Sequence, residues 1–397
     1  MKAIKLLSTV LIVCVLAFSA AGCAGKEADE SAIDLTEAVA TQSEVENVPE
    51  EAALPESAGE DDSIADADNA QETVQEIPDP EDLPESTPSP EEEAQILYEN
   101  GQAFDAAMLL VDCGMLRKAY EYYDFSDLIG AQGHFTIALK LDGTLLSTGN
   151  GYYGQTDTEG ISGVTAMDVG YRHTVCLMED GTVYCFGGNG WLQCNTQKWS
   201  DVTKVATGWF ETYGILSDGT VVAKGDTTAG TMHVPELSDV IYIDGGRYHM
   251  IALHPDGTCT ALGRNDQKQK EVADWTDIVD ITCGEFNSYG LKSDGTVVGC
   301  GDNTYHQLDG IDEWTDIVKL AAGTRHVVGL RADGTVVSAG ANQYTERDVE
   351  EWSDIIAISA GHHHTLGLKS DGTLIATGVN NQYECEVTDW QLFTREG

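Results

Sequence analysis

Three consecutive histidines are the group in this chain that most resembles a metal site. His362, His363 and His364 follow one another in the run SAGHHHTLGLKSDGT. Zinc needs several ligands that converge tetrahedrally, whereas neighbouring residues of a strand point to opposite faces. His364 also stands seven residues before an Asp-Gly-Thr tripeptide, a position that is histidine in three other segments. We therefore predict that these histidines satisfy polar groups inside the fold, and that the chain holds no metal and no cofactor.

Two carboxylates are candidates for catalysis. Propellers do host catalysis, and Glu211 or Glu285 could serve as the carboxylate of an active site. No nucleophile–base pair and no motif of fixed spacing accompanies them. We predict a protein without enzymatic activity; a hydrolase or lyase acting on a cell-wall glycan is the alternative.

The chain has ten cysteines. Cys14 lies in a leader segment described below and Cys23 at its end, which leaves eight. Cys176 and Cys185 flank Asp180-Gly181, and a two-residue hairpin loop there would place them opposite each other. We predict a Cys176–Cys185 disulfide, whereas a three-residue loop would make them diagonal neighbours. The remaining six have no assigned partner: Cys113, Cys194, Cys259, Cys283, Cys300 and Cys385.

A repeat governs the chain from residue 123 onward. Asp-Gly-Thr occurs seven times, with successive spacings of 38, 38, 38, 38, 39 and 38 residues. A glycine follows each Asp by seven residues, and a leucine or isoleucine precedes it by three. The tripeptides begin at Asp142, Asp180, Asp218, Asp256, Asp294, Asp333 and Asp371.

This repeat predicts an all-β fold, a seven-bladed β-propeller of about 38-residue repeats. Short apolar runs bounded by glycine indicate several strands in each unit. We expect each blade to be a four-stranded antiparallel meander. Segments near residues 123–129 and 390–393 lie at opposite ends of the repeat region, and we expect them to meet in one blade and close the ring.

Two sets of loops carry aromatic, arginine and histidine side chains. One set precedes the hairpin of each unit and the other follows the late glycine. Loops alternate ends in a meander, so both sets belong at one face, opposite the Asp-Gly-Thr turns. Such residues are enriched at binding hot spots. The predicted partner-binding residues are Tyr171, Arg172, Trp209, Phe210, Arg247, Tyr248, Phe286, Arg325 and His362 in the first set, with Tyr153, Trp191 and Tyr305 in the second.

The N-terminus has the layout of a secretory signal peptide. Lys2 and Lys5 precede an apolar run, and small residues lead to Cys23. The segment 1–22 resembles the bacterial lipoprotein leader, which implies that Cys23 is lipidated and tethers the protein to a membrane at the cell surface. An ordinary leader with a chance cysteine is the alternative.

An acidic segment follows the leader. Residues 24–93 contain 24 acidic residues and one basic residue, so 23–89 is predicted to be a disordered linker. The chain carries a formal charge of −46; without this segment's 23 net negative charges and the leader's two lysines, −25 remains for residues 94–397. That charge disfavours nucleic acid and anionic membrane as partners. Membrane attachment is expected only through the lipid.

A short helical segment is predicted for residues 90–122, before the propeller at 123–397. Ser89 can cap a helix, Pro90 suits its first position and Glu92 completes a capping box. We expect this segment to pack against the next domain or to space it.

The repeat resembles that of the regulator of chromosome condensation family. The shared pattern reads W-[ST]-D-I-hydrophobic-x-[IL]-x-x-G-x-x-H-x-x-x-L-x-x-D-G-T-V-x-x-x-G-x-N over residues 123–393. In style the chain is similar to compact secreted bacterial propellers, such as the propeller-type β-lactamase inhibitory proteins. The nuclear member of the family acts on a small GTPase and on chromatin. The chain departs from it in having no insertion between repeats, a leader peptide and an acidic surface.

The leading hypothesis is a surface-tethered, monomeric, non-enzymatic module that binds a protein or peptide through the aromatic loops. Glycan binding is an alternative, because aromatic rings also stack on sugars.

Overall fold

The computed structural model describes residues 88–234 and 237–394. The predicted leader peptide, the lipidated Cys23 and the acidic linker up to residue 87 lie outside the described residues. Within them, no helix is both long and apolar enough to cross a membrane.

From residue 88 onward, three helices precede the strands: α2 (Pro90–Glu99), α3 (Ala103–Asp112) and α4 (Leu116–Ala119). The capping box at α2 has the form that the sequence indicates, because the Ser89 hydroxyl accepts from Glu92 N and the Glu92 carboxylate accepts from Ser89 N. A 3₁₀ turn, η2 (Phe125–Leu128), then leads into the first strand.

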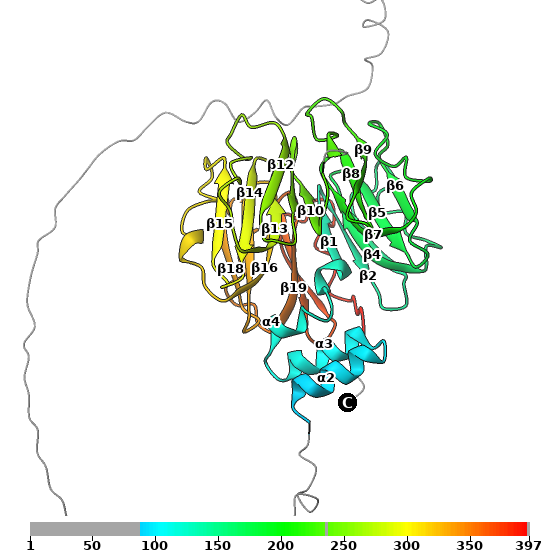
Figure 1. The fold of residues 1–397 in the computed structure, drawn as a ribbon, viewed down its shortest axis with the longest axis vertical. Coiled ribbons are helices and arrows are strands. Elements are labelled where there is room, and N and C mark those ends of the chain that lie inside the picture. The colour runs from blue at the N-terminus through cyan, green and yellow to red at the C-terminus, as the bar shows by residue number, and fades with distance from the viewer. Residues whose placement is uncertain (1–87, 235–236, 395–397) are drawn as a thin grey trace, which may run out of the picture. The chain divides into compact units, whose positions relative to one another are not determined.

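The strands form seven antiparallel sheets, each built from three consecutive strands, in the residues that the structure describes (Figure 1). Blades 1 to 4 are β1 (Ile129–Gln132), β2 (Phe135–Leu139), β3 (Leu145–Gly149); β4 (Val164–Val169), β5 (His173–Met178), β6 (Val183–Gly187); β7 (Val202–Thr207), β8 (Glu211–Leu216), β9 (Val221–Gly225); β10 (Tyr242–Gly245), β11 (His249–Leu253) and β12 (Cys259–Gly263). Blades 5 to 7 are β13 (Ile278–Cys283), β14 (Asn287–Lys292), β15 (Val297–Gly301); β16 (Ile317–Ala322), β17 (His326–Arg331), β18 (Val336–Gly340); β19 (Ile355–Ala360), β20 (His364–Lys369) and β21 (Leu374–Gly378). Between blades 5 and 6 lies a 3₁₀ turn, η4 (Ile311–Glu313).

The sheets close into a ring, as predicted, through their first strands. These strands contact one another in the order β1, β4, β7, β10, β13, β16, β19 and then β1 again. The prediction of four strands per blade is wrong, because the segment after each third strand is built of turns. Each blade also comes from one continuous stretch of chain, so the expected blade shared by the two ends is not formed. Instead Gln391 bridges to Thr373 of the last blade.

The hairpin between second and third strands has a three-residue loop. In blade 2, Met178 N donates to Thr182 O and Gly181 N donates to Met178 O, with Gly181 at φ 75°. A left-handed glycine after a type I turn is typical of this loop length. The Asp180 side chain accepts from Thr182 N at 3.0 Å and from its hydroxyl at 2.6 Å. Equivalent Asp–Thr bonds occur in all seven hairpins.

This loop length makes the predicted Cys176–Cys185 disulfide wrong. Cys176 pairs with Tyr184 across the hairpin and Cys185 with Val175, so one residue of register puts the two cysteines on opposite faces. Cys185 is instead bonded to Cys194, with a Cα–Cα distance of 4.9 Å. Cys176 is a free, fully buried thiol.

A tryptophan packed on a glycine fills the core of four blades. A Cβ atom added at Gly290 would lie 2.9 Å from the Trp275 ring. The same pairing joins Trp199 with Gly214, Trp314 with Gly329 and Trp352 with Gly367. In blade 2 the tryptophan position holds Ile161, which is smaller and leaves room for the Cys176 side chain. The thiol of Cys176 is thus a core residue.

Polar side chains join the inner strands around the ring axis. Asp168 accepts from the N–H and the hydroxyl of Thr207 in the next blade at 2.7 and 2.9 Å, and Asp244 accepts from Cys283 N at 2.8 Å. Burial raises the pKa of Asp168 to about 6 and that of Asp244 to about 8. These strands surround a small axial cavity of about 110 Å³.

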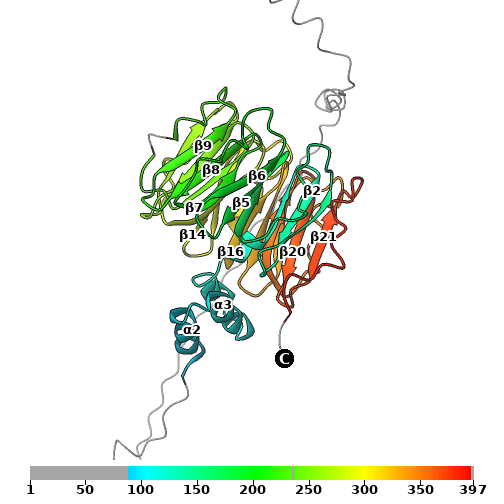
Figure 2. The same ribbon diagram turned by 90° about the vertical axis from the view of Figure 1, so that its right-hand side faces the viewer.

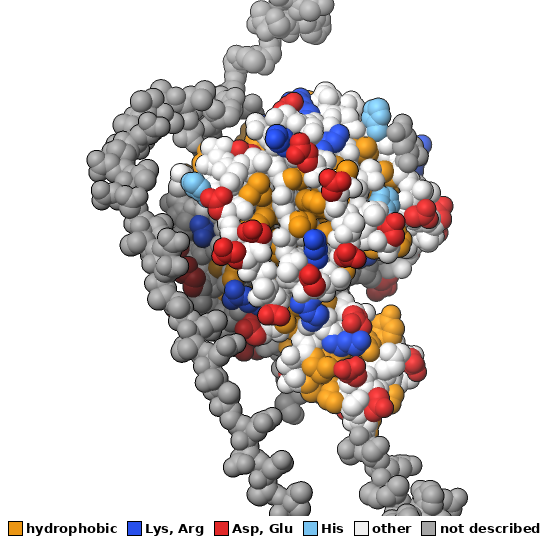
Figure 3. Space-filling view, turned by 60° about the vertical axis from the view of Figure 1, so that its left-hand side comes forward, with side chains coloured by type: hydrophobic (Ala, Val, Ile, Leu, Met, Phe, Trp, Pro, Cys, Tyr) orange, Lys and Arg blue, Asp and Glu red, His pale blue; other side chains and the backbone are white. Residues whose placement is uncertain are grey.

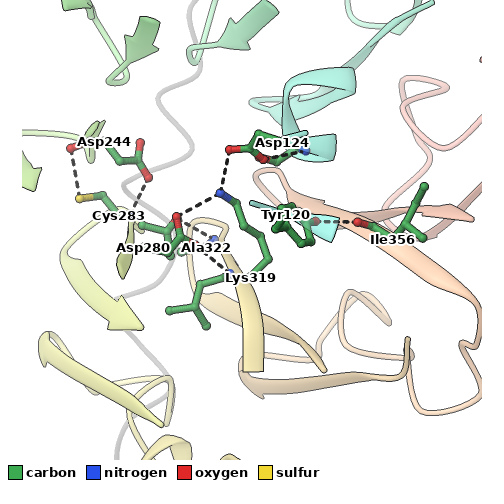
Figure 4. A network of polar contacts seen from close by, with 11 residues as sticks. Tyr120, Asp124, Asp244, Asp280, Cys283, Lys319, Ala322 and Ile356 are labelled. Atoms are coloured by element: carbon green, nitrogen blue, oxygen red, sulfur yellow. Dashed lines mark hydrogen bonds and ion pairs between the residues drawn. The ribbon is translucent and has the colours of Figure 1, made fainter. Parts of the chain in front are cut away.

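A buried ion triad sits at the same axis. Lys319 Nζ lies 3.3 Å from Asp124 and 3.1 Å from Asp280, and Figure 4 shows the lysine between these two carboxylates. Burial alone would lower the pKa of Lys319, but the two carboxylates hold it well above its ordinary value. Asp124 precedes η2, so the triad ties the segment before the first strand to blades 5 and 6.

The helical segment is attached to the ring by further contacts. The Tyr120 hydroxyl donates to Ile356 O at 2.6 Å and Arg117 donates to Ile317 O at 3.0 Å. The ring centroids of Phe104 and Phe393 are 4.9 Å apart. In Figures 1 and 2, α2 and α3 lie beside one end of the ring. Hydrophobic side chains also gather on the outer surface of this helical lobe in Figure 3, where charged side chains of both signs are spread over the ring.

Candidate functional site

The two sets of aromatic loops lie at one end of the ring. We call the connections between first and second strands the first loops, and the connections after the third strands the second loops. They touch in several blades: the Arg172 guanidinium lies 4.6 Å from the Tyr153 ring centroid, and the Phe210 and Trp191 centroids are 6.2 Å apart. Antiparallel strands place the Asp-Gly-Thr turns at the opposite end. We call the end with both loop sets the aromatic face.

Side chains that stand two residues before the second strand of each blade meet around the axis. Tyr171 and Trp209 stack with centroids 4.5 Å apart and planes 6° apart. His362, from the far end of the repeat array, lies 6.0 Å from the Tyr171 ring and 6.4 Å from the Trp209 ring. We call this set the inner ring: Gly133, Tyr171, Trp209, Arg247, Glu285, Thr324 and His362.

Backbone hydrogen bonds between neighbouring loops hold the inner ring together. Arg247 N donates to Glu285 O and His362 N donates to Gly133 O. Gly133 must be glycine, because a Cβ atom there would lie 2.4 Å from the Tyr171 carbonyl oxygen. The inner ring is therefore rigid at the level of the main chain.

The next residue of each first loop points toward the second loops. Arg325 lies 4.3 Å from the Tyr305 ring centroid, and the His363 and Tyr344 rings are 4.8 Å apart. We call this set the outer ring: His134, Arg172, Phe210, Tyr248, Phe286, Arg325 and His363. The outer ring and the second-loop aromatics form a belt around the inner ring.

Buried side chains fix the second loops. Gln193, which is 2% exposed, accepts from Trp191 N at 2.9 Å. In the same way Gln155 accepts from Tyr153 N, Gln307 from Tyr305 N and Glu346 from Tyr344 N, at 2.7 to 2.9 Å. The backbone N–H of each of these four aromatic residues is thus held by a buried side chain or by one that is part of the same loop.

The recurring histidine lies beneath the face and joins adjacent blades. His173 Nε2 is 3.0 Å from the Thr212 hydroxyl, and His249 Nε2 is 3.1 Å from that of Ser288. His326 pairs in the same way with Thr365, and His364 with Thr136. Burial lowers the pKa to about 4 for His173, His249 and His364 and to about 3 for His326. The predicted structural role of this position is confirmed.

The three consecutive histidines therefore fall in three different places. His362 belongs to the inner ring, His363 to the outer ring and His364 to the contact between blades. His134 joins the first two, with its Nε2 atom 3.1 Å from His362 Nδ1. No group of three or more metal-binding side chains is gathered anywhere in residues 88–234 and 237–394.

The two candidate catalytic carboxylates have structural partners. Glu211 occupies the recurring histidine position, is 1% exposed, and accepts from Phe210 N and from the Thr231 hydroxyl. Burial raises its pKa to about 8. Glu285 lies 2.5 Å from Arg247 in an ion pair. Neither carboxylate is presented to solvent beside a nucleophile.

Arginine is concentrated on the aromatic face. The described residues contain seven arginines, and all except Arg117 and Arg331 belong to the two loop sets. Arg247 lies 5.0 Å from the Trp209 and Tyr248 ring centroids, and Arg264 lies 4.3 Å from that of Tyr248. Such cation–π contacts hold the guanidinium groups over the rings.

Most of the predicted binding residues form one connected patch. Ring and cation–π contacts join Tyr153, Arg172, Tyr171, Trp209, His362, Phe210, Trp191, Arg247, Tyr248 and Phe286. Arg325 and Tyr305 contact each other in blades 5 and 6. Arg264, Glu285 and Tyr344 are not among the predicted partner-binding residues but also contact side chains of the aromatic face.

The chain carries the regulator of chromosome condensation (RCC1) repeat in four places, at residues 164–190, 278–307, 317–345 and 355–384. No curated protein matches the sequence.

Solved structures share the fold at low sequence identity. The CRINKLY WD40 ectodomain of the Arabidopsis thaliana receptor kinase ACR4 is 15% identical, with a TM-score of 0.56, covering 66% of this chain and 98% of that one. The ectodomain of the Physcomitrella patens receptor kinase CR4 is 14% identical, with a TM-score of 0.55 and coverages of 63% and 72%. Yeast RCC1 (Prp20), in a structure with Kap60, is 16% identical, with a TM-score of 0.52 and coverages of 69% and 84%.

Proposed function

We propose that this propeller of RCC1 repeats is a non-enzymatic module that binds a protein or peptide through its aromatic face. The lipoprotein-type leader supports a further part of the proposal: lipid on Cys23 holds the module at the cell surface and the acidic segment separates it from the membrane.

One observation carries the proposal. The aromatic and arginine side chains lie on a rigid frame, because interblade backbone bonds fix the inner ring and buried glutamines fix the second loops. Binding then costs little ordering of loops, which is what favours affinity. Trp191 is 48% exposed and Tyr344 46%, so the outer part of the face is open to a partner.

The neighbours of the fold support a protein as the ligand. Yeast Prp20 is recorded in complex with Kap60, and a second study of it describes binding to Gsp1p and histones. Those partners are properties of that protein, and for this chain only the binding of a protein is inferred.

The test is capture of a partner from the surroundings of the cell by the full chain. We expect Phe210→Ala and Tyr248→Ala each to reduce capture at least tenfold while the melting temperature changes little, because both rings are part-exposed. Tyr184→Ala is the matched control, since Tyr184 is 49% exposed on β6, away from the loops. Equal capture by all three variants would refute the face assignment.

The same variants distinguish glycan binding from protein binding. A glycan array probed with the full chain would show ring-dependent binding if a sugar is the ligand, and we expect none. Cys23→Ser should release the protein from the membrane fraction; unchanged fractionation would contradict lipid anchoring.

A further inference from the structure

We infer that the partner segment bound by the aromatic face is acidic, and that Arg172 and Arg264 are the residues that recognise its carboxylates. The inference rests on the proposed function, and adds to it the charge of the partner. Charge-assisted bonds from arginine to carboxylate are among the stronger polar contacts in proteins.

Arg172 is held in position by rings and has no acidic partner. Its guanidinium lies 4.6 Å from the Tyr153 centroid and 5.4 Å from the Tyr171 centroid. Its carbonyl accepts from Gly188 N at 2.7 Å, and a Cβ atom at Gly188 would lie 3.2 Å from the Arg172 Cβ. Close packing therefore fixes both ends of the residue. Among the described residues, no carboxylate lies within ion-pair distance of it.

Arg264 repeats this arrangement two blades further on. It is exposed, its guanidinium lies 4.3 Å from the Tyr248 centroid, and no ion pair involves it within the described part of the chain. Its N–H donates to Tyr248 O at 2.8 Å. The face thus presents a second ring-supported cation.

Arg247, in the inner ring, is an arginine of the aromatic face whose charge is neutralised within the fold. Its Nη1 atom is 2.5 Å from Glu285, a residue that is 8% exposed. Arg247 therefore has a carboxylate partner, whereas among the described residues Arg172 and Arg264 form no ion pair. Blade 3 lies between these two cations and contributes Phe210, beside Trp191. The order of charges and rings fits a segment with an apolar centre and acidic residues on both sides.

The net negative charge of the chain opposes the binding of an acidic peptide. Residues 94–397 carry a net charge of −25, so the molecule as a whole repels acidic peptides. Binding of such a peptide therefore requires a local cationic site rather than general attraction.

The test measures fluorescence anisotropy of two labelled peptides with the full chain. One peptide has two glutamates on each side of a Tyr-Leu-Tyr centre, and the other has glutamine in place of each glutamate. We expect at least tenfold tighter binding of the glutamate peptide, and weakening of that preference as sodium chloride is raised. Equal affinity for the two peptides, or no binding of either, overturns the inference.

Variants locate the charge recognition. Arg172→Gln should weaken binding of the glutamate peptide at least tenfold and that of the glutamine peptide less than twofold, and Arg172→Lys should fall between. Arg331→Gln, at the Asp-Gly-Thr end of β17, is the matched control and should change neither. An equal loss in Arg331→Gln overturns the inference. If both peptides bind equally and Phe210→Ala abolishes both, the acidic partner is refuted while the proposed face stands.

Discussion

At the scale of residues, one repeat position holds buried side chains that differ in type and in hydrogen-bond partner from blade to blade. His173, His249, His326 and His364 stand there in four blades, and Glu211 stands there in blade 3. All five are buried immediately below the aromatic face, so the protonation of this layer affects stability.

Glu211 should make the protein less stable as pH rises. Its pKa is about 8 in the fold and about 4.5 when exposed, so the folded state binds the extra proton between those values. Stability from this group is complete below pH about 4.5 and is lost as pH rises through about 8. In Glu211→Gln we expect this fall to be smaller by on the order of 2 kcal/mol.

Urea unfolding at pH 5, 6.5 and 8 measures the effect. Glu179→Gln, an exposed residue of blade 2, is the control and should parallel the wild type. A Glu211→Gln curve parallel to the wild type would show that Glu211 is ionised at neutral pH.

The tryptophan–glycine pairs predict that adding one methyl group at the glycine position costs more stability than removing one where alanine stands there. Gly290→Ala places a Cβ atom against Trp275, and overpacking of this kind costs about 1–3 kcal/mol. Ala252 occupies the same position in blade 4, where Leu237 replaces the tryptophan, so Ala252→Gly should cost about 1 kcal/mol or less. Thermal unfolding of both variants decides; equal shifts would contradict the packing described.

At the scale of elements, repeat phase made most of the structure predictable. The seven Asp-Gly-Thr turns determined the number of blades, and alternating strand direction determined which loops share a face. The segment after each third strand was harder to predict. It is held by polar side chains such as Gln193 rather than by strand pairing, and such side chains leave no hydrophobic periodicity in the sequence.

The disulfide shows how a single residue of register limits prediction. An Asp-Gly dipeptide such as Asp180-Gly181 is compatible with a two-residue or a three-residue hairpin loop. Only the hydrogen bonds that Met178 makes show which of the two loops is formed. Cys194 lies in a turn-rich loop whose path no periodicity reveals, so its bond to Cys185 could not be predicted. Arg172 and Tyr153 were recognised from residue type, but their contact depends on Gly188 and Gln155.

The attachment of the helical segment depends on the buried triad. In Lys319→Met, Asp124 and Asp280 lose their counter-charge, and breaking such a buried pair costs about 3–5 kcal/mol. We expect a lower melting temperature and faster tryptic cleavage at Arg117 and Lys118. Lys140→Met is the control: its pair with Asp142 is at the surface, so its loss should leave the melting temperature and the cleavage rate nearly unchanged. Unchanged cleavage in Lys319→Met would mean that the triad does not hold this segment.

At the scale of the whole molecule, the layer of buried histidines predicts weaker packing of blades in acid. Their pKa values of about 3 to 4 lie below the ordinary value of about 6.5, so the unfolded chain binds protons first. Their contribution to stability is present above pH about 6.5 and is lost as pH falls through about 4, by about 1–2 kcal/mol per histidine at pH 5. Relative to the wild type, His249→Gln should lose less stability between pH 7 and 5, and an identical loss would contradict the buried neutral state.

The aromatic face is also a property of the whole ring, since His362 of blade 7 meets rings of blades 2 and 3. Hydrogen–deuterium exchange of the full chain, alone and with its captured partner, tests the binding face most directly. We predict slowed exchange in the first loops at residues 170–172, 208–210 and 246–248, with no change at the Asp-Gly-Thr turns. Protection confined to those turns or to residues 90–119, with the first loops unchanged, would contradict binding through the aromatic face.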